Sequence, residues 1–410
     1  MPEAVTSRYR WVILGLLTVI GTFVAALPSS CLPPLFKEIS GDLHLSLVDI
    51  GWVWGFTSVA GILVSIPGGL LSDRMNSRWF IGISCILVGI TGASRGLANS
   101  YSTLLLTVFL NGLVRLTLPV AVVKIIGSWF KGKNLGLAQG IGAFGMGFGL
   151  MLGPYISSAY LSPWLNGWRN VMYVYGLIAV FFGLLWLWLA REPARTASSG
   201  GSSEQIAIGS AIMRVLRNKY VWFLAFMLFF RVSCLMSMTG YIPTYLKDLG
   251  WANSSADWTL SAFYAASIIV VIPISMFSDR IGARKPVLLV GIVISFIAVG
   301  LIPFVSGPGV WALMILAGFL MDGFMAIFTA LLLETEGVGS VLSGTAIGVV
   351  FTLAQFGNAV FPPIGNSLAA FGARWPFIFW AALGALALIP FMLVKETGKK
   401  IRFREIRTIR

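Results

Sequence analysis

The most prominent pattern in the sequence is a series of long apolar runs separated by short polar segments. A helix needs about 20 apolar residues to cross the hydrocarbon core of a bilayer, and twelve runs reach that length. Their approximate bounds are 10–33, 48–71, 79–98, 102–127, 135–159, 170–190, 220–244, 258–278, 286–304, 310–333, 341–366 and 376–394. The pattern therefore predicts an all-α membrane protein with twelve transmembrane helices.

The one long polar segment between these runs separates the first six from the last six. It includes a flexible Ser/Gly-rich stretch at 196–203, and residues 206–217 favour a short amphipathic helix on the membrane surface. We therefore expect four parts, which are an N-terminal six-helix bundle at 1–190, a cytoplasmic linker at 191–219, a C-terminal six-helix bundle at 220–394 and a basic cytoplasmic tail at 395–410.

Two loops in corresponding places of the two halves share one charged pattern. Each has an aspartate followed by an arginine, with another arginine four positions further on. These residues are Asp73, Arg74 and Arg78 after the second run, and Asp279, Arg280 and Arg284 after the eighth. The offset that relates the loops also places Gly142 on Gly348 in the fifth and eleventh runs. One offset that serves two regions predicts duplicated, pseudo-symmetric halves.

Composition and charge support a membrane location. The chain is 57% hydrophobic and only 11% charged, whereas a soluble domain carries roughly 25% charged residues. The net charge of +14 arises in short loops, so we expect lipid contacts and no nucleic acid. Most Lys and Arg residues lie on the side of the two termini, and the opposite side holds only Lys37, Arg95, Arg169, Lys247 and Arg374. This bias predicts a plasma (inner) membrane protein with both termini cytoplasmic.

The sequence gives no support for an enzyme. It has no nucleotide-binding loop, no metal-type cluster and no nucleophile paired with a histidine. The three cysteines, Cys31, Cys85 and Cys234, all lie in apolar runs, and an odd number without metal-type spacing argues against a disulfide framework or a zinc site. We therefore expect neither a cofactor nor a bound metal.

The two loops that carry Asp73-Arg74 and Asp279-Arg280 resemble the best-known motif of the major facilitator superfamily, Gly-x-x-x-Asp-Arg-x-Gly-x-Arg/Lys. Asn76 replaces the second glycine in the first copy, and Ser275 replaces the first glycine in the second copy. The stretch from Gly145 to Pro154 is similar to the family's glycine-proline motif, and the resemblance covers essentially the whole chain. It implies two six-helix bundles around a central cavity lined by spans one, four, seven and ten. It also implies alternation between inward-open and outward-open states.

The resemblance implies that the two Asp-Arg loops act as a conformational latch. The alternative is that Asp73 and Asp279 only cap or neutralise helix ends. Glu334 and Glu336, which follow span ten, either engage Arg280 and Arg284 or lie in solvent.

A second, more local resemblance concerns substrate class. Trp129-Phe130 and the stretch Gly-Leu-Ala-Gln-Gly at 136–140 are similar to porters for small anions of the nitrate/nitrite and cyanate kind. Nitrate porters have substrate arginines in spans two and eight. This chain has no arginine in the body of either span, which sets it apart from porters of nitrate itself.

Three charged residues lie near the middle of apolar runs. They are Arg115 in span four, Arg231 in span seven and Asp322 in span ten. A charge at that depth is costly and is tolerated mainly in a wet cavity or an ion pair. The offset between the halves places Asp322 beside the position of Arg115, so we expect the two to face each other. We predict Asn111, one turn before Arg115, and Gln355 in span eleven as further ligands.

Two hypotheses account for the role of these charged residues. In the first, Arg115 and Arg231 bind an anionic substrate, and Asp322 neutralises an arginine or carries a proton. In the second, Arg115 and Asp322 form a permanent structural pair. The sequence therefore favours a secondary transporter of a small anion, either an inorganic oxyanion or a small carboxylate. Transport would be coupled to protons or run by exchange. A proton-coupled exporter of drugs or lipophilic compounds is the alternative, and a sensor that has lost transport is a third reading.

Overall fold

The computed structural model describes residues 3–130, 132–191 and 208–397, and all its regular elements there are helical. The side chains of 3–7, 65–70, 72–74, 133, 208–209, 211 and 339–341 are outside this description. Within it, 12 helical stretches are long and apolar enough to cross a membrane. They run over Arg8–Ser30, Leu47–Val64, Ser77–Leu97, Tyr101–Trp129, Asn134–Trp164, Trp168–Leu189, Lys219–Asp248, Asn253–Ile281, Lys285–Phe304, Pro308–Glu334, Leu342–Phe371 and Trp375–Met392. The twelve predicted spans are therefore confirmed.

Contacts between Cα atoms divide the chain into two compact units. Unit 1 is Met1–Ala197 with Gly240–Tyr264, and unit 2 is Ser198–Thr239 with Ala265–Arg410. Two long helices, α12 (Lys219–Asp248) and α13 (Asn253–Ile281), contribute to both units. The end of α12 and the start of α13 thus pack with helices of the first half of the sequence.

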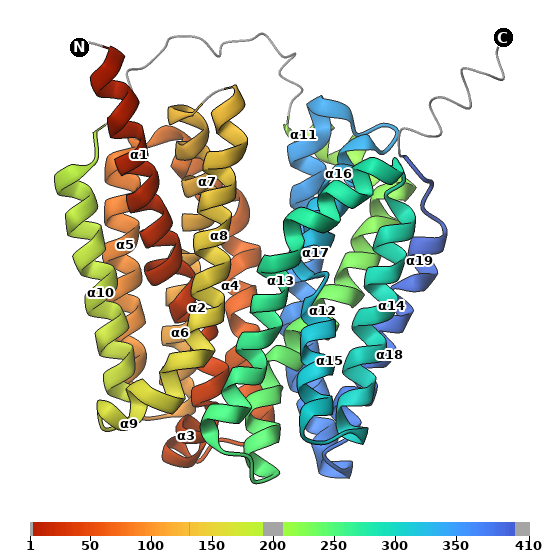
Figure 1. Cartoon of the computed structure of the whole chain (residues 1–410). Helices are drawn as coiled ribbons and strands as arrows, with labels where there is room; N and C mark the ends of the chain where they lie inside the picture. Colours follow the sequence, from red (N-terminus) through yellow and green to blue (C-terminus); the bar gives the residue numbers. More distant parts are fainter. Residues whose placement is uncertain (1–2, 131, 192–207, 398–410) are drawn as a thin grey trace. The chain divides into compact units, whose positions relative to one another are not determined.

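Unit 1 is otherwise built from the first ten α-helices and three shorter helical elements (Figure 1). These are α1 (Glu3–Ile20), η1 (Gly21–Ala26), α2 (Leu27–Ser30), α3 (Leu32–Leu43), α4 (Leu47–Arg74), α5 (Ser77–Ser94), η2 (Arg95–Leu97), α6 (Tyr101–Arg115), α7 (Leu118–Trp129), α8 (Lys133–Ile156), η3 (Ser157–Leu161), α9 (Ser162–Trp164) and α10 (Trp168–Leu189). Within the unit α5 packs along α10, and η1 and α2 pack on α8.

Glycines of α8 allow this close contact with span one. Gly145, Gly149 and Gly153 recur every four residues and so share one helix face. The carbonyl of Gly145 accepts a hydrogen bond from Thr22 Oγ1 at 2.8 Å. A Cβ atom at Gly149 would lie 2.5 Å from the carbonyl oxygen of Thr22 and 2.7 Å from Ala26 Cβ. Only glycine fits at this spacing. Small residues at such an interface allow helices to approach each other closely in a membrane.

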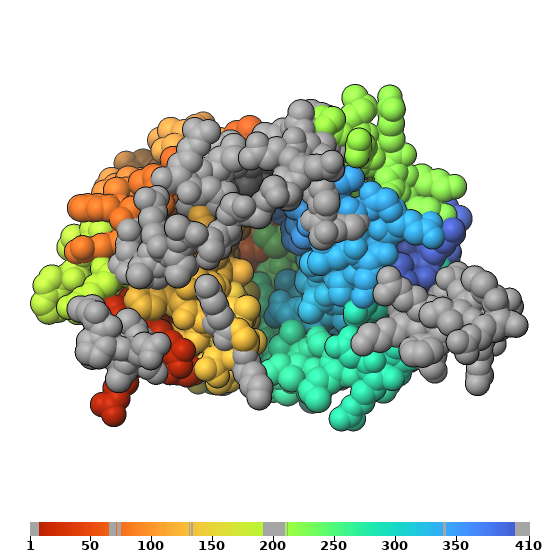
Figure 2. All heavy atoms as spheres, turned by 90° about the horizontal axis from the view of Figure 1, so that it is seen from above, coloured from red at the N-terminus to blue at the C-terminus, as the bar shows by residue number. Residues whose placement is uncertain are grey.

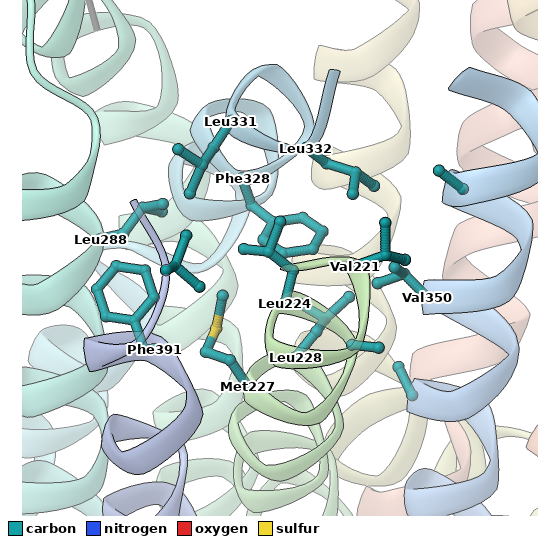
Figure 3. Close-up of a cluster of buried hydrophobic side chains, with 14 of the residues drawn as sticks. Val221, Leu224, Met227, Leu228, Leu288, Phe328, Leu331, Leu332, Val350 and Phe391 are labelled. Atoms are coloured by element: carbon teal, nitrogen blue, oxygen red, sulfur yellow. The ribbon is translucent and has the colours of Figure 1, made fainter. Parts of the chain in front are cut away.

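Unit 2 contains the remaining helices. Besides parts of α12 and α13 these are α11 (Ile208–Leu216), α14 (Lys285–Leu301), η4 (Ile302–Phe304), α15 (Pro308–Gly318), α16 (Met321–Glu334), α17 (Gly339–Ser367), η5 (Leu368–Phe371), α18 (Trp375–Leu386) and α19 (Leu388–Met392). Their core brings together Leu224 and Leu228 of α12, Leu288 of α14, Phe328 of α16 and Phe391 of α19, all at most 1% exposed (Figure 3).

The linker and the tail are described only in part. Helix α11 falls in the segment where the sequence predicts an amphipathic helix. Residues 192–207 of the predicted linker and 398–410 of the predicted tail lie outside the described residues.

Spans four and ten are each broken in the middle. Span four consists of α6, which ends at Arg115, and α7, which begins at Leu118. Pro119 follows that start, and it has no N–H to donate to the carbonyl of Arg115 four residues earlier. Span ten consists of α15 and α16, with the break at Phe319 and Leu320. Such breaks leave backbone polar groups that need partners inside a membrane protein.

Candidate functional site

Arg115 is the last residue of α6 and is partly exposed. Within the part of the chain that the structure describes, its guanidinium has neither an ion pair nor a hydrogen-bond partner. The C-terminal end of a helix carries a partial negative charge that stabilises a cation. The break in span four therefore supports the Arg115 charge without neutralising it, and leaves its N–H groups available for a ligand.

Asn111 lies one helical turn before Arg115 and is 4% exposed. Its Nδ2 group donates to the carbonyl of Val88 and to Thr91 Oγ1, both at 3.2 Å. Asn111 thus connects α6 to α5. Its amide is engaged inside unit 1, where it fixes α6 against α5 one turn before Arg115.

Asp322 lies in the first turn of α16, directly after the break in span ten. It forms a reciprocal pair with Ser267 of α13. Ser267 Oγ donates to Asp322 Oδ2 at 2.6 Å and accepts from the Asp322 backbone N–H at 2.9 Å. The N-terminal end of a helix stabilises a carboxylate, so the charge of Asp322 is supported by α16 itself.

Arg231 of α12 is only 1% exposed. Its guanidinium carbon lies 3.6 Å from the ring centroid of Phe324. Its Nη2 group donates to the carbonyl of Leu320 at 3.2 Å and to Ser295 Oγ at 3.4 Å. Leu320 is at the break in span ten, so Arg231 stabilises the turn that precedes Asp322.

Gln355 of α17 is partly exposed, and its Oε1 accepts a hydrogen bond from Asn358 Nδ2 at 3.1 Å. The Asn358 Oδ1 atom is buried without a hydrogen-bond partner among the described residues, and the same holds for the hydroxyls of Ser233 and Ser237 on α12. Unit 2 therefore contains unsatisfied polar groups, which are costly unless a ligand or water meets them.

The predicted encounter of Arg115 with Asp322 stays a prediction, because the two residues belong to different units. Each is described by its own surroundings. Arg115 is unpaired within the described part of unit 1, and Asp322 is bonded to Ser267 within unit 2.

The first Asp-Arg loop follows α4. The side chains of Asp73 and Arg74 lie outside the described residues. Asn76, which replaces the motif glycine, is the N-cap of α5 and accepts the Arg78 backbone N–H at 2.9 Å. The Arg78 Nε group donates to the carbonyl of Leu187 at 2.8 Å. Arg78 thus ties the start of α5 to the end of α10.

The second Asp-Arg loop keeps its glycine, and Gly282 has a φ of 65° that favours glycine. Arg284 forms two parallel hydrogen bonds of 2.9 Å with the carboxylate of Glu334, and Asp279 lies 3.3 Å away. The bonds to Glu334 raise the pKa of Arg284. Arg280 is exposed and has no ion pair among the described residues. Figure 2 shows the end of unit 2 at which α13 ends and α14 begins.

The structure also shows a buried ion pair to which sequence analysis assigned no role. Lys247 near the end of α12 lies 2.7 Å from Asp257 Oδ1 of α13, and their side chains are 2% and 0% exposed. The Lys247 ammonium also donates to the carbonyl of Pro34 at 2.6 Å and to Ser158 Oγ at 3.0 Å. It therefore joins α12 and α13 to α3 and η3. The predicted eighth span begins at 258, one residue after Asp257, so the sequence contained no signal of a buried pair; the structure begins α13 at Asn253 and so includes Asp257.

A pocket of about 540 Å³ lies beside this pair in unit 1, lined by Lys247, Lys37, Glu38, Ser158 and Asn253 among others. Lys37 pairs with Asp248 at 2.9 Å in an exposed position. The Glu38 carboxylate accepts from Ser162 Oγ at 2.6 Å and from a backbone N–H at 2.8 Å. The carboxylate of Glu38, which lines this pocket, is thus already hydrogen-bonded.

Asp42, near the end of α3, is bonded to α10. Its Oδ2 accepts from Trp168 Nε1 at 2.9 Å and from Arg169. The hydrogen bond from Trp168, followed by the bond and charge of Arg169, lowers the pKa of Asp42.

Comparisons with known proteins agree with this architecture. The Major Facilitator Superfamily model matches residues 18–254 and 246–408. The cis,cis-muconate transport protein of Acinetobacter baylyi is 24% identical over 407 aligned residues, which cover 95% of this chain and 96% of that protein. The nitrite extrusion protein of Bacillus subtilis is 25% identical over 389 residues, covering 92% of this chain and 91% of that protein.

A likeness in structure supports the fold. The crystal structure of the nucleoside transporter NupG superposes with a TM-score of 0.76 at 14% identity, over 93% of this chain and 98% of that chain. The predicted all-α architecture of twelve spans in the major facilitator fold is confirmed, as is the resemblance to anion porters among the relatives. The chain belongs to the Major Facilitator Superfamily and is a multi-pass membrane transporter, not an enzyme.

Proposed function

We propose that this transporter carries a small anion, an inorganic oxyanion or a small carboxylate, by alternating access. The observation that supports this most directly is Arg115, a partly exposed guanidinium at the break in span four without a partner among the described residues. Guanidinium groups bind carboxylates and oxyanions through paired, charge-assisted hydrogen bonds. The names of two relatives refer to cis,cis-muconate and nitrite, which are both anions.

The other predicted ligands have secondary parts in this proposal. Asn111 fixes α6 next to Arg115 through its bonds to α5. Gln355 offers a partly exposed amide from unit 2. Arg231 adds a positive charge from unit 2, and its contacts with Leu320 and Phe324 hold that charge at the break in span ten.

Asp322 is our candidate for coupling to protons. A carboxylate in the first turn of α16, bonded to a serine hydroxyl of α13, can take up a proton when the anion leaves or enters. Exchange of one anion for another is the alternative coupling mode. Replacement of Asp322 by Asn separates the two, because proton-driven uptake would be lost while anion exchange would continue.

Uptake into proteoliposomes tests the substrate class. The panel contains nitrate, cyanate and small carboxylates, with and without an imposed pH gradient. Arg115→Gln should lower the affinity for the transported anion about 10- to 100-fold, because a charge-assisted hydrogen bond contributes about 1.5–3 kcal/mol. Arg214→Gln, which removes an exposed arginine of α11, should leave uptake unchanged. Transport of lipophilic cations with no anion transport would support the exporter instead.

A charge exchange tests whether Arg115 acts on substrate or only on Asp322. The variant that combines Arg115→Asp with Asp322→Arg keeps both charges but removes the guanidinium from the break in span four. We expect this variant to be inactive. Full recovery of uptake would show that the two residues form a structural pair, and it would remove Arg115 from the substrate site.

We further propose that the termini lie in the cytoplasm and that the two Asp-Arg loops form the latch. The excess of Lys and Arg on the side of the termini supports this orientation. The bidentate Arg284–Glu334 contact and the bond from Arg78 to Leu187 are the described parts of the latch. Impermeant maleimide should label a cysteine placed in the tail only from the cytoplasmic side.

A further inference from the structure

A second arginine of unit 1, Arg95, is buried, and no acid pairs with it in the described part of the chain. It begins the short helix η2 at the end of span three and is only 2% exposed, although the sequence suggests a residue of the outer loops. Its Nε group donates to the carbonyl of Gly92 at 3.1 Å, and its Nη1 group to the carbonyl of Pro28 at 3.5 Å. Its Nη2 group has no hydrogen-bond partner among the described residues.

The Nη2 end of Arg95 lies near Asn111 of α6. A Cβ atom at Gly92 would be 3.5 Å from Arg95 Nη2 and 3.6 Å from Asn111 Nδ2, so these two nitrogens flank one glycine. Asn111 is one helical turn before Arg115 on α6. Arg95 is also within electrostatic range of Arg115, and Cys31 is within range of both.

Two positive charges therefore lie near each other inside unit 1, and no carboxylate pairs with either among the described residues. Removing a guanidinium from water costs several kcal/mol, and an opposite charge is the usual compensation. A second like charge adds to that cost. The carbonyls of Gly92 and Pro28 compensate Arg95 only in part. An anion bound beside both guanidinium groups would compensate their charges further, and a ligand with two negative charges would do so best.

We propose that Arg95 and Arg115 together select a dianion, such as a short dicarboxylate, over a monoanion of the same size. This inference rests on the proposed function and refines its substrate class. Arg115, which is partly exposed, binds the first carboxylate, and the buried Arg95 meets the second. Arg95 is then a specificity residue, since one carboxylate on Arg115 suffices for weaker binding of a monoanion.

The wild-type protein provides the first test, with succinate and monomethyl succinate as matched ligands. At neutral pH succinate carries two charges and its half-ester carries one, while their length is nearly the same. Equilibrium binding to the purified full chain should favour succinate by about 10-fold or more, since one charge-assisted contact contributes about 1.5–3 kcal/mol. Equal affinities would overturn the proposal. If neither ligand nor any other anion binds, the proposed function fails instead.

Variants then assign the selectivity to Arg95. Arg95→Gln should lower the affinity for succinate about 10- to 100-fold and change the affinity for monomethyl succinate by less than threefold. Arg115→Gln should weaken both ligands. Arg95→Lys, which keeps the charge but loses the planar fork, should retain part of the preference and guards against a folding defect in Arg95→Gln. Equal losses for both ligands in Arg95→Gln would show that Arg95 is only structural.

Discussion

The buried pair of Lys247 and Asp257 makes a sharp test of how this structure is stabilised. We consider Lys247→Met, which keeps the length of the side chain and removes its ammonium. The Asp257 side chain is 0% exposed, so the variant leaves a carboxylate in the interior of unit 1 with no cation beside it. Removal of one partner from a buried pair costs about 3–5 kcal/mol, because the remaining charge is uncompensated.

The magnitude follows from the contacts of the ammonium. Besides Asp257 at 2.7 Å, it donates to the Pro34 carbonyl at 2.6 Å and to Ser158 Oγ at 3.0 Å. Combining Lys247→Met with Asp257→Leu removes both charges but still leaves those two acceptors without a donor. Each buried unsatisfied group costs about 1–3 kcal/mol, and the adjacent pocket is large enough to admit water that would lower this cost. We therefore expect the double variant to be more stable than the single one by about 2 kcal/mol.

Thermal unfolding of the purified protein measures these differences. With roughly 2 °C of Tm per kcal/mol in a chain of this size, Lys247→Met should lower Tm by about 6–10 °C and the double variant by clearly less. The matched control is Lys37→Met, since Lys37 forms a pair with Asp248 that is about half exposed. Exposed pairs contribute about 0–1 kcal/mol. A Tm for Lys247→Met equal to that of the control, or a double variant less stable than the single one, would refute this reasoning.

Two further predictions concern packing and pH. Gly149→Ala should destabilise the protein by about 1–3 kcal/mol, because its Cβ would meet the Thr22 carbonyl at 2.5 Å. The control is Gly140→Ala, whose Cβ would have no atom within 4 Å. By Tm this control should be neutral or slightly stabilising. The pKa of Asp42 is lowered, first by the Trp168 hydrogen bond. The contribution of Asp42 to the free energy of unfolding is therefore fully present above the ordinary carboxyl pKa. That contribution should be lost as the pH falls through the lowered value, and it is less than about 1 kcal/mol because Asp42 is largely exposed. Tm measured from pH 5 downward should therefore fall slightly less steeply in Asp42→Asn, and identical slopes would contradict the assignment.

The spans were predictable because the lipid sets a length that every apolar run must meet. The second Asp-Arg loop was predictable as well, since its residues are contiguous in sequence, and its contact with Glu334 agrees with one of the two alternatives. The break in span four has a visible cause in Pro119. The break in span ten has no proline, and it is seen only in the backbone around Leu320.

Other features depend on contacts between distant segments, which a single sequence does not contain. Lys247 appears in the sequence as a loop base, and only the approach of Pro34 and Ser158 shows that it is buried. Arg95 also appears as an outer-loop residue by position. Its burial follows from the packing of span three against span one, at the Pro28 carbonyl.

The two broken spans explain why charged residues are tolerated at this depth. Arg115 ends α6 and Asp322 lies in the first turn of α16, so each charge lies at the helix end whose dipole has the opposite sign. A permanent ion pair needs no such arrangement, because each partner would neutralise the other. Helix ends stabilise a charge without occupying its hydrogen-bonding groups. Among the described residues the Arg115 guanidinium has no hydrogen-bond partner, and this agrees with the proposal that it binds an anion and releases it again.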